Sequence, residues 1–159
     1  MGLRKILTDK EPALHKTCKE VTTFDAKLHK LLDDMRETLI ESQGVGLAAP
    51  QVGIIRRVVL VDTGDEILEL VNPTLVETDG EQEGAEGCLS VPGKYGLVKR
   101  PYIAKVKAQD RYGDWYEVEG EELIARCFCH ELDHLDGIIY TEVMDRFLTD
   151  EELGYDEEE

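Results

Sequence analysis

The sequence is poor in positive charge and in long apolar runs, and each shortage argues against a class of function. Only 18 Lys and Arg stand against 35 Asp and Glu, so the net charge at pH 7 is −17 with neutral histidine. A surface this acidic repels phosphate backbones and anionic lipids, so we expect neither direct nucleic-acid binding nor membrane docking. No apolar run approaches the roughly 20 residues that span a bilayer.

The first twenty residues also lack the apolar core of a secretory signal. We therefore expect a cytoplasmic protein, in which thiols stay reduced and serve as core residues, metal ligands or catalytic groups. The cysteines concerned are Cys18, Cys88, Cys127 and Cys129.

The length of 159 residues fits one domain, and we predict that residues 1–148 form it and that 149–159 are an acidic, partly frayed tail. Helical spacing of apolar residues predicts an amino-terminal helix over 23–43, capped at Thr22, and a second helix over 121–136. Strands are expected near 58–61, 67–71, 104–108 and 115–118. This order predicts an α+β fold with a mostly antiparallel sheet packed around the central second helix.

Two histidines four residues apart, with a carboxylate beside the first, are the strongest chemical signal. His130, Glu131 and His134 fit H-E-x-x-H, and on a helix both imidazoles project from one face. A helical wheel places them with Cys127 on the apolar side, and Cys129 roughly opposite. Uncompensated polar groups are costly there, and a bound ion removes that cost, so we predict a metal site. An exposed helix carrying these residues by chance is the simpler alternative.

The helix cannot complete this site alone. Cys127 lies seven residues from His134, roughly 10 Å along the axis, which also disfavours a structural zinc held by Cys127, Cys129 and both histidines. The third ligand must come from elsewhere. Cys88 is a better candidate than His29, because the adjacent Gly87 permits a close backbone approach. A small buried thiol is the alternative role for Cys88.

The segment 44–51 contains the pattern G-x-G-x-x-A, which also occurs in dinucleotide-binding loops. That fingerprint must follow a strand and begin a helix, whereas here it follows a helix and contains Pro50. We predict instead an extended loop whose small residues admit a substrate backbone, with the amide of Gln51 reaching into the site. A plain connection between helix and strand is the alternative.

Together, these segments resemble the peptide deformylase family. Its motifs G-x-G-L-A-A-x-Q, E-G-C-L-S and H-E-x-x-H match residues 44–51, 86–90 and 130–134 in order, and Gly137 extends the last one. The resemblance covers about 44–137, and the amino-terminal helix suits it. It implies a single metallohydrolase domain that removes the N-formyl group from the amino-terminal methionine of newly made proteins and releases formate.

The resemblance also implies a role for each matching residue. Cys88, His130 and His134 would bind one divalent ion, most commonly Fe²⁺, with Ni²⁺, Co²⁺ or Zn²⁺ able to substitute and water as the fourth ligand. Glu131 would act on that water as general base and then as proton donor. The remaining matches are two oxyanion donors (the Gln51 side chain and the Leu89 N–H), four residues lining the substrate site (Val45, Gly46, Gly87 and Cys127) and an ion pair that orients the loop (Glu86 and Arg100).

Two positions depart from the family pattern. Cys129 replaces the usual Gln, which we expect to alter the surroundings of the ligands without loss of the metal. Tyr95 stands where many members carry Arg near the substrate entrance. The chain also ends in acid, without the basic helix that some members use at the ribosome, so its expected partners are formyl-Met nascent polypeptides with only transient ribosome proximity.

Two rival hypotheses remain open. The first is an endopeptidase of the H-E-x-x-H type with a third ligand such as Glu142. The second is a non-catalytic metal-binding module that keeps the deformylase fold. Formate release from formyl-Met-Ala-Ser and digestion of casein separate these hypotheses.

Overall fold

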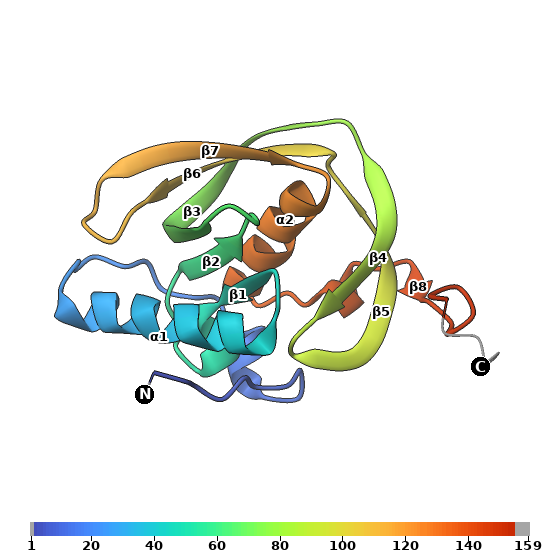
Figure 1. Cartoon of the computed structure of the whole chain (residues 1–159), viewed down its shortest axis with the longest axis horizontal. Helices are drawn as coiled ribbons and strands as arrows, with labels where there is room; N and C mark the ends of the chain where they lie inside the picture. The colour runs from blue at the N-terminus through green and yellow to red at the C-terminus, as the bar shows by residue number, and fades with distance from the viewer. Residues whose placement is uncertain (1, 155–159) are drawn as a thin grey trace.

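The computed structural model describes residues 2–154 (Figure 1). No helix in this range is long and apolar enough to cross a membrane. The elements in chain order, with η marking a short 3₁₀ helix, are η1 (Pro12–His15), α1 (Ala26–Ser42), β1 (Gly46–Ala48), η2 (Ala49–Val52), β2 (Val58–Asp62), β3 (Ile67–Asp79), β4 (Gln82–Cys88), β5 (Val91–Arg100), β6 (Ile103–Gln109), β7 (Trp115–Glu121), α2 (Leu123–Leu135), η3 (Tyr140–Glu142) and β8 (Arg146–Phe147).

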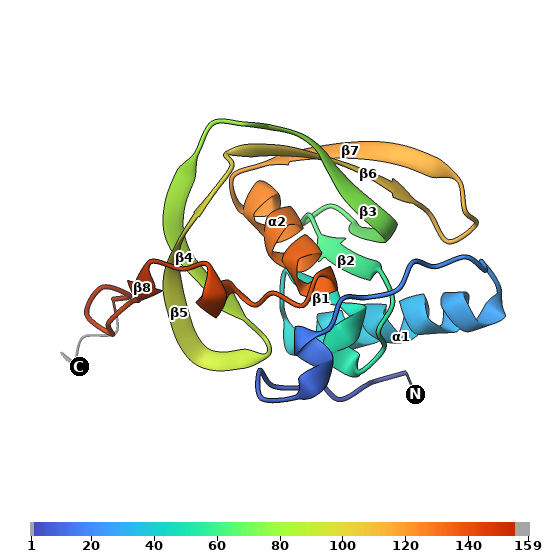
Figure 2. The same ribbon diagram turned by 180° about the vertical axis from the view of Figure 1, so that it is seen from behind.

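The strands form two antiparallel sheets. Five strands pair in the order β1-β2-β3-β6-β7, and three pair in the order β4-β5-β8. Figures 1 and 2 show α2 enclosed between the larger sheet and the hairpin of β4 and β5. The prediction of an α+β fold with a mostly antiparallel sheet around a central helix is therefore confirmed.

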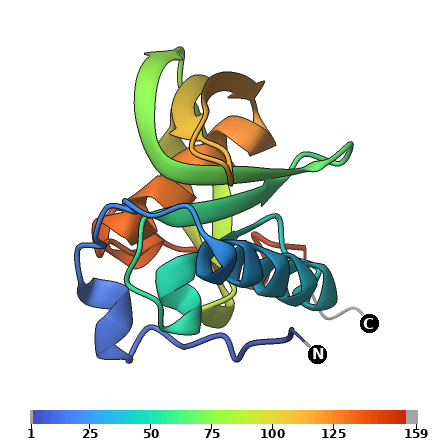
Figure 3. The same cartoon turned by 90° about the vertical axis from the view of Figure 1, so that its left-hand side faces the viewer.

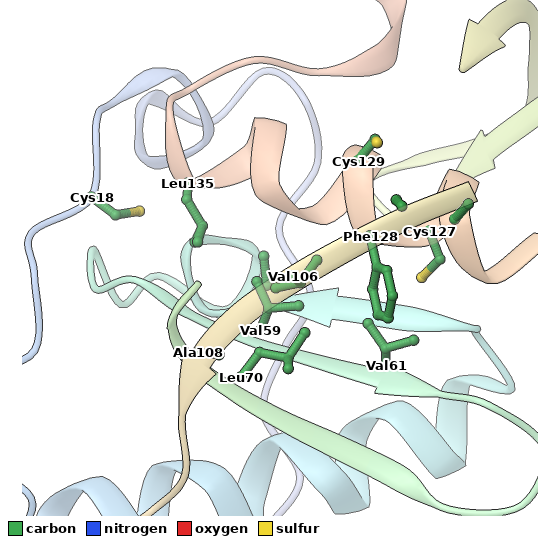
Figure 4. Close-up of a cluster of buried hydrophobic side chains, with 13 residues drawn as sticks. Cys18, Val59, Val61, Leu70, Val106, Ala108, Cys127, Phe128, Cys129 and Leu135 are labelled. Atoms are coloured by element: carbon green, nitrogen blue, oxygen red, sulfur yellow. The ribbon is translucent and has the colours of Figure 1, made fainter. Parts of the chain in front are cut away.

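The larger sheet separates the two helices, as Figure 3 shows. Along β2, Val58 and Leu60 pack in the cluster that contains the buried face of α1, whereas Val59 and Val61 pack in the cluster that contains α2. Successive side chains of a strand point to opposite faces, so one strand supplies both cores. In Figure 4 the ring of Phe128 projects from α2 toward Val61. This packing fixes α2, and with it the H-E-x-x-H residues, against the sheet.

The first helix starts later than predicted. Its N-cap is Asp25, whose carboxylate accepts a hydrogen bond from the Leu28 N–H at 3.2 Å, so the prediction of a cap at Thr22 was wrong. An Asp side chain placed before the first turn satisfies an amide that otherwise has no partner. The helix ends at Ser42, and its C-cap Gln43 has a left-handed backbone with φ of 59°.

The hairpin of β4 and β5 was not predicted, and the expected loop at 46–48 forms strand β1. The sequence of β4, QEGAEGC, contains two glycines and no apolar alternation, so the strand depends on pairing with β5. The predicted acidic tail is described only as far as Gly154, with Arg146 and Glu152 in an ion pair at 2.7 Å. Residues 155–159 lie outside the described range.

Candidate metal centre

Helix α2 carries the two histidines in the interior of the protein. Their ring centroids lie 4.9 Å apart, and His134 is fully buried. Burial lowers the pKa of His134 well below its ordinary value, so this ring is neutral and can offer a nitrogen lone pair. Arg126 and Cys129 of the same helix are buried as well.

Cys88 reaches this pair from the end of β4. Its Sγ lies 3.3 Å from Nε2 of His134, and one donor atom each from Cys88, His130 and His134 falls within 4.8 Å of the others. A separation of 3.3 Å is close to the edge of a tetrahedron with metal–ligand bonds of about 2.0–2.3 Å. His15 and His29 are elsewhere, where their ring nitrogens contact the carbonyls of Asp9 and Arg111.

Glu86 holds the orientation of His130. Its Oε2 accepts a hydrogen bond from His130 Nδ1 at 2.5 Å, which leaves Nε2 of that ring free to bind an ion. Arg100 donates to both oxygens of Glu86, at 3.0 Å and 2.7 Å, and to Asp133 at 2.8 Å. Burial alone would raise the pKa of Glu86, but hydrogen bonds from His130 and Arg100 outweigh it and lower this pKa to about 2. The carboxylate therefore stays charged.

Glu131 is a buried carboxyl too, but unlike Glu86 it has no arginine bound to it within residues 2–154. Only 4% of it is exposed, and its Oε1 has no hydrogen-bond partner among the described residues. Burial away from water raises the pKa of this carboxyl to about 7. A carboxyl with such a pKa can take and return a proton near neutral pH.

This arrangement fits a divalent transition metal. One thiol and two imidazoles form a nitrogen and sulfur donor set that suits zinc or iron and does not suit magnesium or calcium. The buried Oε1 of Glu131 also needs a polar partner, and a water held by an ion at Cys88, His130 and His134 would supply one.

Gln51 is held in a single orientation beside this cluster. Its Oε1 accepts a hydrogen bond from the Ala48 N–H at 2.9 Å, and its Nε2 donates to Ser90 Oγ at 3.1 Å. The same Nε2 lies 3.7 Å from Cys88 Sγ. Leu89 occupies the turn between Cys88 and Ser90, at the end of the hairpin. Sequence reasoning missed the part played by Ser90, although it belongs to the motif E-G-C-L-S.

These groups line a cavity of about 560 Å³ that is open to solvent. A Cβ added at Gly46 would lie 2.6 Å from Cys127 Sγ and 2.7 Å from Glu131 Oε2, and one at Gly87 would lie 2.5 Å from the Tyr95 ring. Both glycines therefore allow these side chains to pack against the backbone more closely than a Cβ would permit. The cavity brings together ten of the predicted residues: Val45, Gly46, Gln51, Glu86, Gly87, Cys88, Leu89, Cys127, His130 and Glu131.

The other residues named in the alternative sites are not part of the ligand cluster. Neither Cys127 nor Cys129 belongs to the ligand cluster. Burial raises the pKa of Cys127 well above its ordinary value and that of Cys129 to about 11, so both are neutral thiols. Glu142 caps η3, where its Oε2 accepts a hydrogen bond from the Ile139 N–H at 3.0 Å.

Sequence reasoning also missed Arg126. Its Nη1 donates to Glu86 at 2.9 Å and to the Val98 carbonyl at 3.1 Å, so it joins the helix to both strands of the hairpin. Its position one helical turn before His130 is a signal that could have indicated this contact.

The chain is similar to proteins of one family over nearly its whole length. The family model described as Polypeptide deformylase matches residues 3–149. A peptide deformylase of Agathobacter rectalis is 53% identical over 150 residues, which cover 94% of this chain and 95% of the relative. One from Caldicellulosiruptor bescii is 49% identical over 153 residues, which cover 96% of this chain and 92% of the relative.

Solved structures agree with these matches. The crystal structure of a peptide deformylase from Legionella pneumophila has a TM-score of 0.87 at 43% identity, covering 90% of this chain and 86% of that one. The structure from Thermotoga maritima also has a TM-score of 0.87, at 39% identity, and covers 90% of this chain and 98% of that one.

Proposed function

The chain belongs to the peptide deformylase family, and from this premise we propose how its own residues perform the family's reaction. It is a hydrolase that removes the N-formyl group from the amino-terminal methionine of newly made proteins and releases formate. The reaction depends on a divalent metal. One observation supports our assignment of the site above all others: Cys88, His130 and His134 converge beside a buried carboxyl, Glu131.

The metal ligands are Cys88, His130 and His134, and the ion is Fe²⁺, with Ni²⁺, Co²⁺ or Zn²⁺ able to replace it. When bound, such an ion polarises a carbonyl and makes water more acidic. Glu86 and Arg100 keep the His130 ring turned so that Nε2 faces the other two ligands. The open cavity leaves room for water and for a formyl group beside these atoms.

Glu131 moves the proton. Its carboxylate accepts a proton from the attacking water and then donates it to the methionine nitrogen as the amide bond breaks. A pKa of about 7 in its buried position suits both steps, because neither protonation state is strongly favoured at neutral pH. Proton transfer of this kind contributes typically about 10²–10⁴-fold to a rate.

Gln51 and Leu89 stabilise the negative charge that develops on the formyl oxygen. The amide of Gln51 is fixed by Ala48 and Ser90, so its Nε2 needs no reorientation during the reaction. The N–H of Leu89 donates from the adjacent turn. Removal of one such donor typically costs about 10²–10³-fold in rate.

The substrate is recognised as a short extended peptide. Gly46 and Gly87 line the part of the cavity that receives the small formyl group, while Val45 and Cys127 line the part that receives the methionine side chain. Backbone pairing at the edge of the loop gives affinity with little dependence on the residues that follow.

We propose the following organisation and setting for the chain. Residues 1–148 form one domain and 149–159 a tail, which the family match over 3–149 supports. The cytoplasm is the proposed location, supported by free thiols at all four cysteines. Nascent formyl-Met chains are the substrate, met during transient proximity to the ribosome, and the net charge of −17 disfavours direct contact with nucleic acid or membrane.

The test is formate release from formyl-Met-Ala-Ser by protein loaded with Fe²⁺ or Co²⁺ under exclusion of oxygen. We expect turnover of this peptide, none of acetyl-Met-Ala-Ser, and no cleavage of casein. Casein digestion without formate release would favour the endopeptidase, and tight metal binding without either activity would favour the non-catalytic module.

A further inference from the structure

We propose that Arg126 is a positioning residue of the metal centre, which acts through Glu86 to hold helix α2 and strand β4 at the separation that the three ligands need. The inference rests on the proposed metal site at Cys88, His130 and His134. It assigns a function to a buried guanidinium that neither binds the ion nor takes part in the proton transfer.

The first argument is that the carboxylate of Glu86 is fully occupied. Oε1 accepts hydrogen bonds from Arg100 Nε at 3.0 Å and from Arg126 Nη1 at 2.9 Å. Oε2 accepts from Arg100 Nη2 at 2.7 Å and from His130 Nδ1 at 2.5 Å. A carboxylate has about four acceptor positions, so each donor holds one of them. Without Arg126, one acceptor position of a buried anion has no partner.

The second argument concerns how α2 is attached to the hairpin. Arg126, His130 and Asp133 lie at spacings of four and three residues, so they share one side of the helix. Arg126 and His130 bind Glu86 of β4, and Asp133 accepts a hydrogen bond from Arg100 of β5 at 2.8 Å. Arg126 is the attachment nearest the start of the helix.

The third argument is that this attachment sets the ligand geometry. Cys88 belongs to the same strand as Glu86, two residues further on, whereas His130 and His134 belong to α2. The separation of β4 and α2 therefore determines how far the Cys88 thiol lies from the two imidazoles. Arg126 joins α2 to β4 through Glu86 and to β5 through the Val98 carbonyl at 3.1 Å, so it fixes that distance before any ion arrives.

Burial makes the contact hard to replace. The side chains of Arg126 and Glu86 are 8% and 3% exposed, so little water can take the place of the guanidinium. Loss of Arg126 leaves one acceptor position of the buried Glu86 carboxylate without a donor, although Arg100 still pairs with its charge, and the neighbouring groups can shift toward that position. Here the neighbour that can move is His130, whose ring is a ligand.

The experiment compares Arg126→Met, Arg126→Lys and Arg111→Met with the wild type. Arg111 is a control, because it too is an ion-paired arginine, with Glu69 at 2.7 Å and Asp33 at 2.8 Å, but lies away from the metal centre. For each protein we would measure the dissociation constant of Co²⁺, the rate of its release to a chelator, and the thiolate-to-cobalt absorption band, together with kcat and KM for formyl-Met-Ala-Ser.

We expect Arg126→Met to bind Co²⁺ about 10- to 100-fold more weakly, the range typical when a group that supports a ligand is lost. Its release rate should rise and its absorption band should change shape, while KM for the peptide stays within about twofold of the wild type. Arg126→Lys should recover part of the affinity, and Arg111→Met none of these changes. Unchanged Co²⁺ affinity and spectrum in Arg126→Met, or a change confined to KM, would overturn the inference.

A double-mutant cycle identifies the route of the effect. In a Glu86→Gln background, Arg126→Met should weaken Co²⁺ binding much less than it does in the wild type, because both changes break the same contact. Full additivity would show that Arg126 does not act through Glu86. If circular dichroism shows that Arg126→Met is unfolded, Arg126→Lys decides the question: weaker Co²⁺ binding supports the inference, and wild-type binding overturns it.

The proposed metal site has its own control, Cys88→Ala. If the wild type fails to bind Co²⁺ tightly, or Cys88→Ala binds it equally well, the assignment of the ligands is wrong. If those two proteins behave as expected and Arg126→Met binds like the wild type, only the role of Arg126 is wrong.

Discussion

Replacement of Glu131 by Gln should abolish deformylation and at the same time stabilise the metal-free protein. The rise of the Glu131 pKa from 4.5 to about 7 corresponds to about 3 kcal/mol between its ionised and neutral forms. In the metal-free protein, ionisation of this buried carboxyl therefore lowers the free energy of unfolding by about this amount. Gln has the same shape without the charge, so at pH 8 the metal-free variant should be more stable to unfolding by up to about 3 kcal/mol.

The pH dependence has a definite sign. Because the folded pKa lies above the unfolded one, the folded state holds more protons between pH 4.5 and about 7. Stability contributed by Glu131 is therefore full below pH 4.5 and is lost as the pH rises through 7. The Glu131→Gln variant does not lose stability in this way. The difference in free energy of unfolding between variant and wild type should therefore be small at pH 4.5, increase between pH 4.5 and about 7, and be largest near pH 8.

Urea unfolding of chelator-treated protein at a series of pH values measures this difference. A bound divalent ion favours the carboxylate, so the advantage of the variant should shrink in the metal-loaded proteins. The matched control is Glu142→Gln, which makes the same change at an exposed side chain. A Glu131→Gln variant that is less stable than the metal-free wild type at pH 8 would refute the argument from burial, and near-normal deformylation would refute the role of Glu131 in proton transfer.

Three further substitutions test the site. Cys88→Ala should lose its tightly held ion at neutral pH, and elemental analysis that still finds one ion per chain would show that another residue is the third ligand. Gly46→Ala places a methyl group 2.7 Å from Glu131 Oε2, so kcat should fall about 100-fold with metal content unchanged; wild-type kcat would contradict the close approach. Cys129→Gln should change activity only a few-fold, because Cys129 is outside the ligand cluster, and loss of metal uptake would disprove this placement.

The local part of the metal centre could be predicted from the sequence. The spacing of His130 and His134 is a property of one helix, so the period of that helix is enough to bring both rings to one side. The position of Cys88 is different, because its Sγ meets Nε2 of His134 only after β4 has paired with β5. The adjacent Gly87 favoured Cys88 as the third ligand but could not show that its thiol lies beside the histidines. The family resemblance implied that position.

The hairpin itself shows why the remainder was missed. Strand β4 is rich in residues that are uncommon in strands, yet its pairing with β5 and the buried contacts of Glu86 hold it extended. Those contacts involve Arg100, Arg126 and His130, at separations of 14 to 44 residues in the chain. Interactions over such separations leave no periodic signal in the sequence, so periodicity could predict α2 but not the partner that covers it.

The placement of the proposed ligands on two distant segments gives the ion a mechanical consequence. A cation held by Cys88 and by the histidines of α2 is a removable cross-link that closes a loop of roughly 40 residues, comparable to a disulfide with a loop-closure term of about 4 kcal/mol. The loop contains β5, β6 and β7. Loss of the ion would therefore remove the cross-link that constrains these three strands. The ion that takes part in the reaction would thus also stabilise the fold.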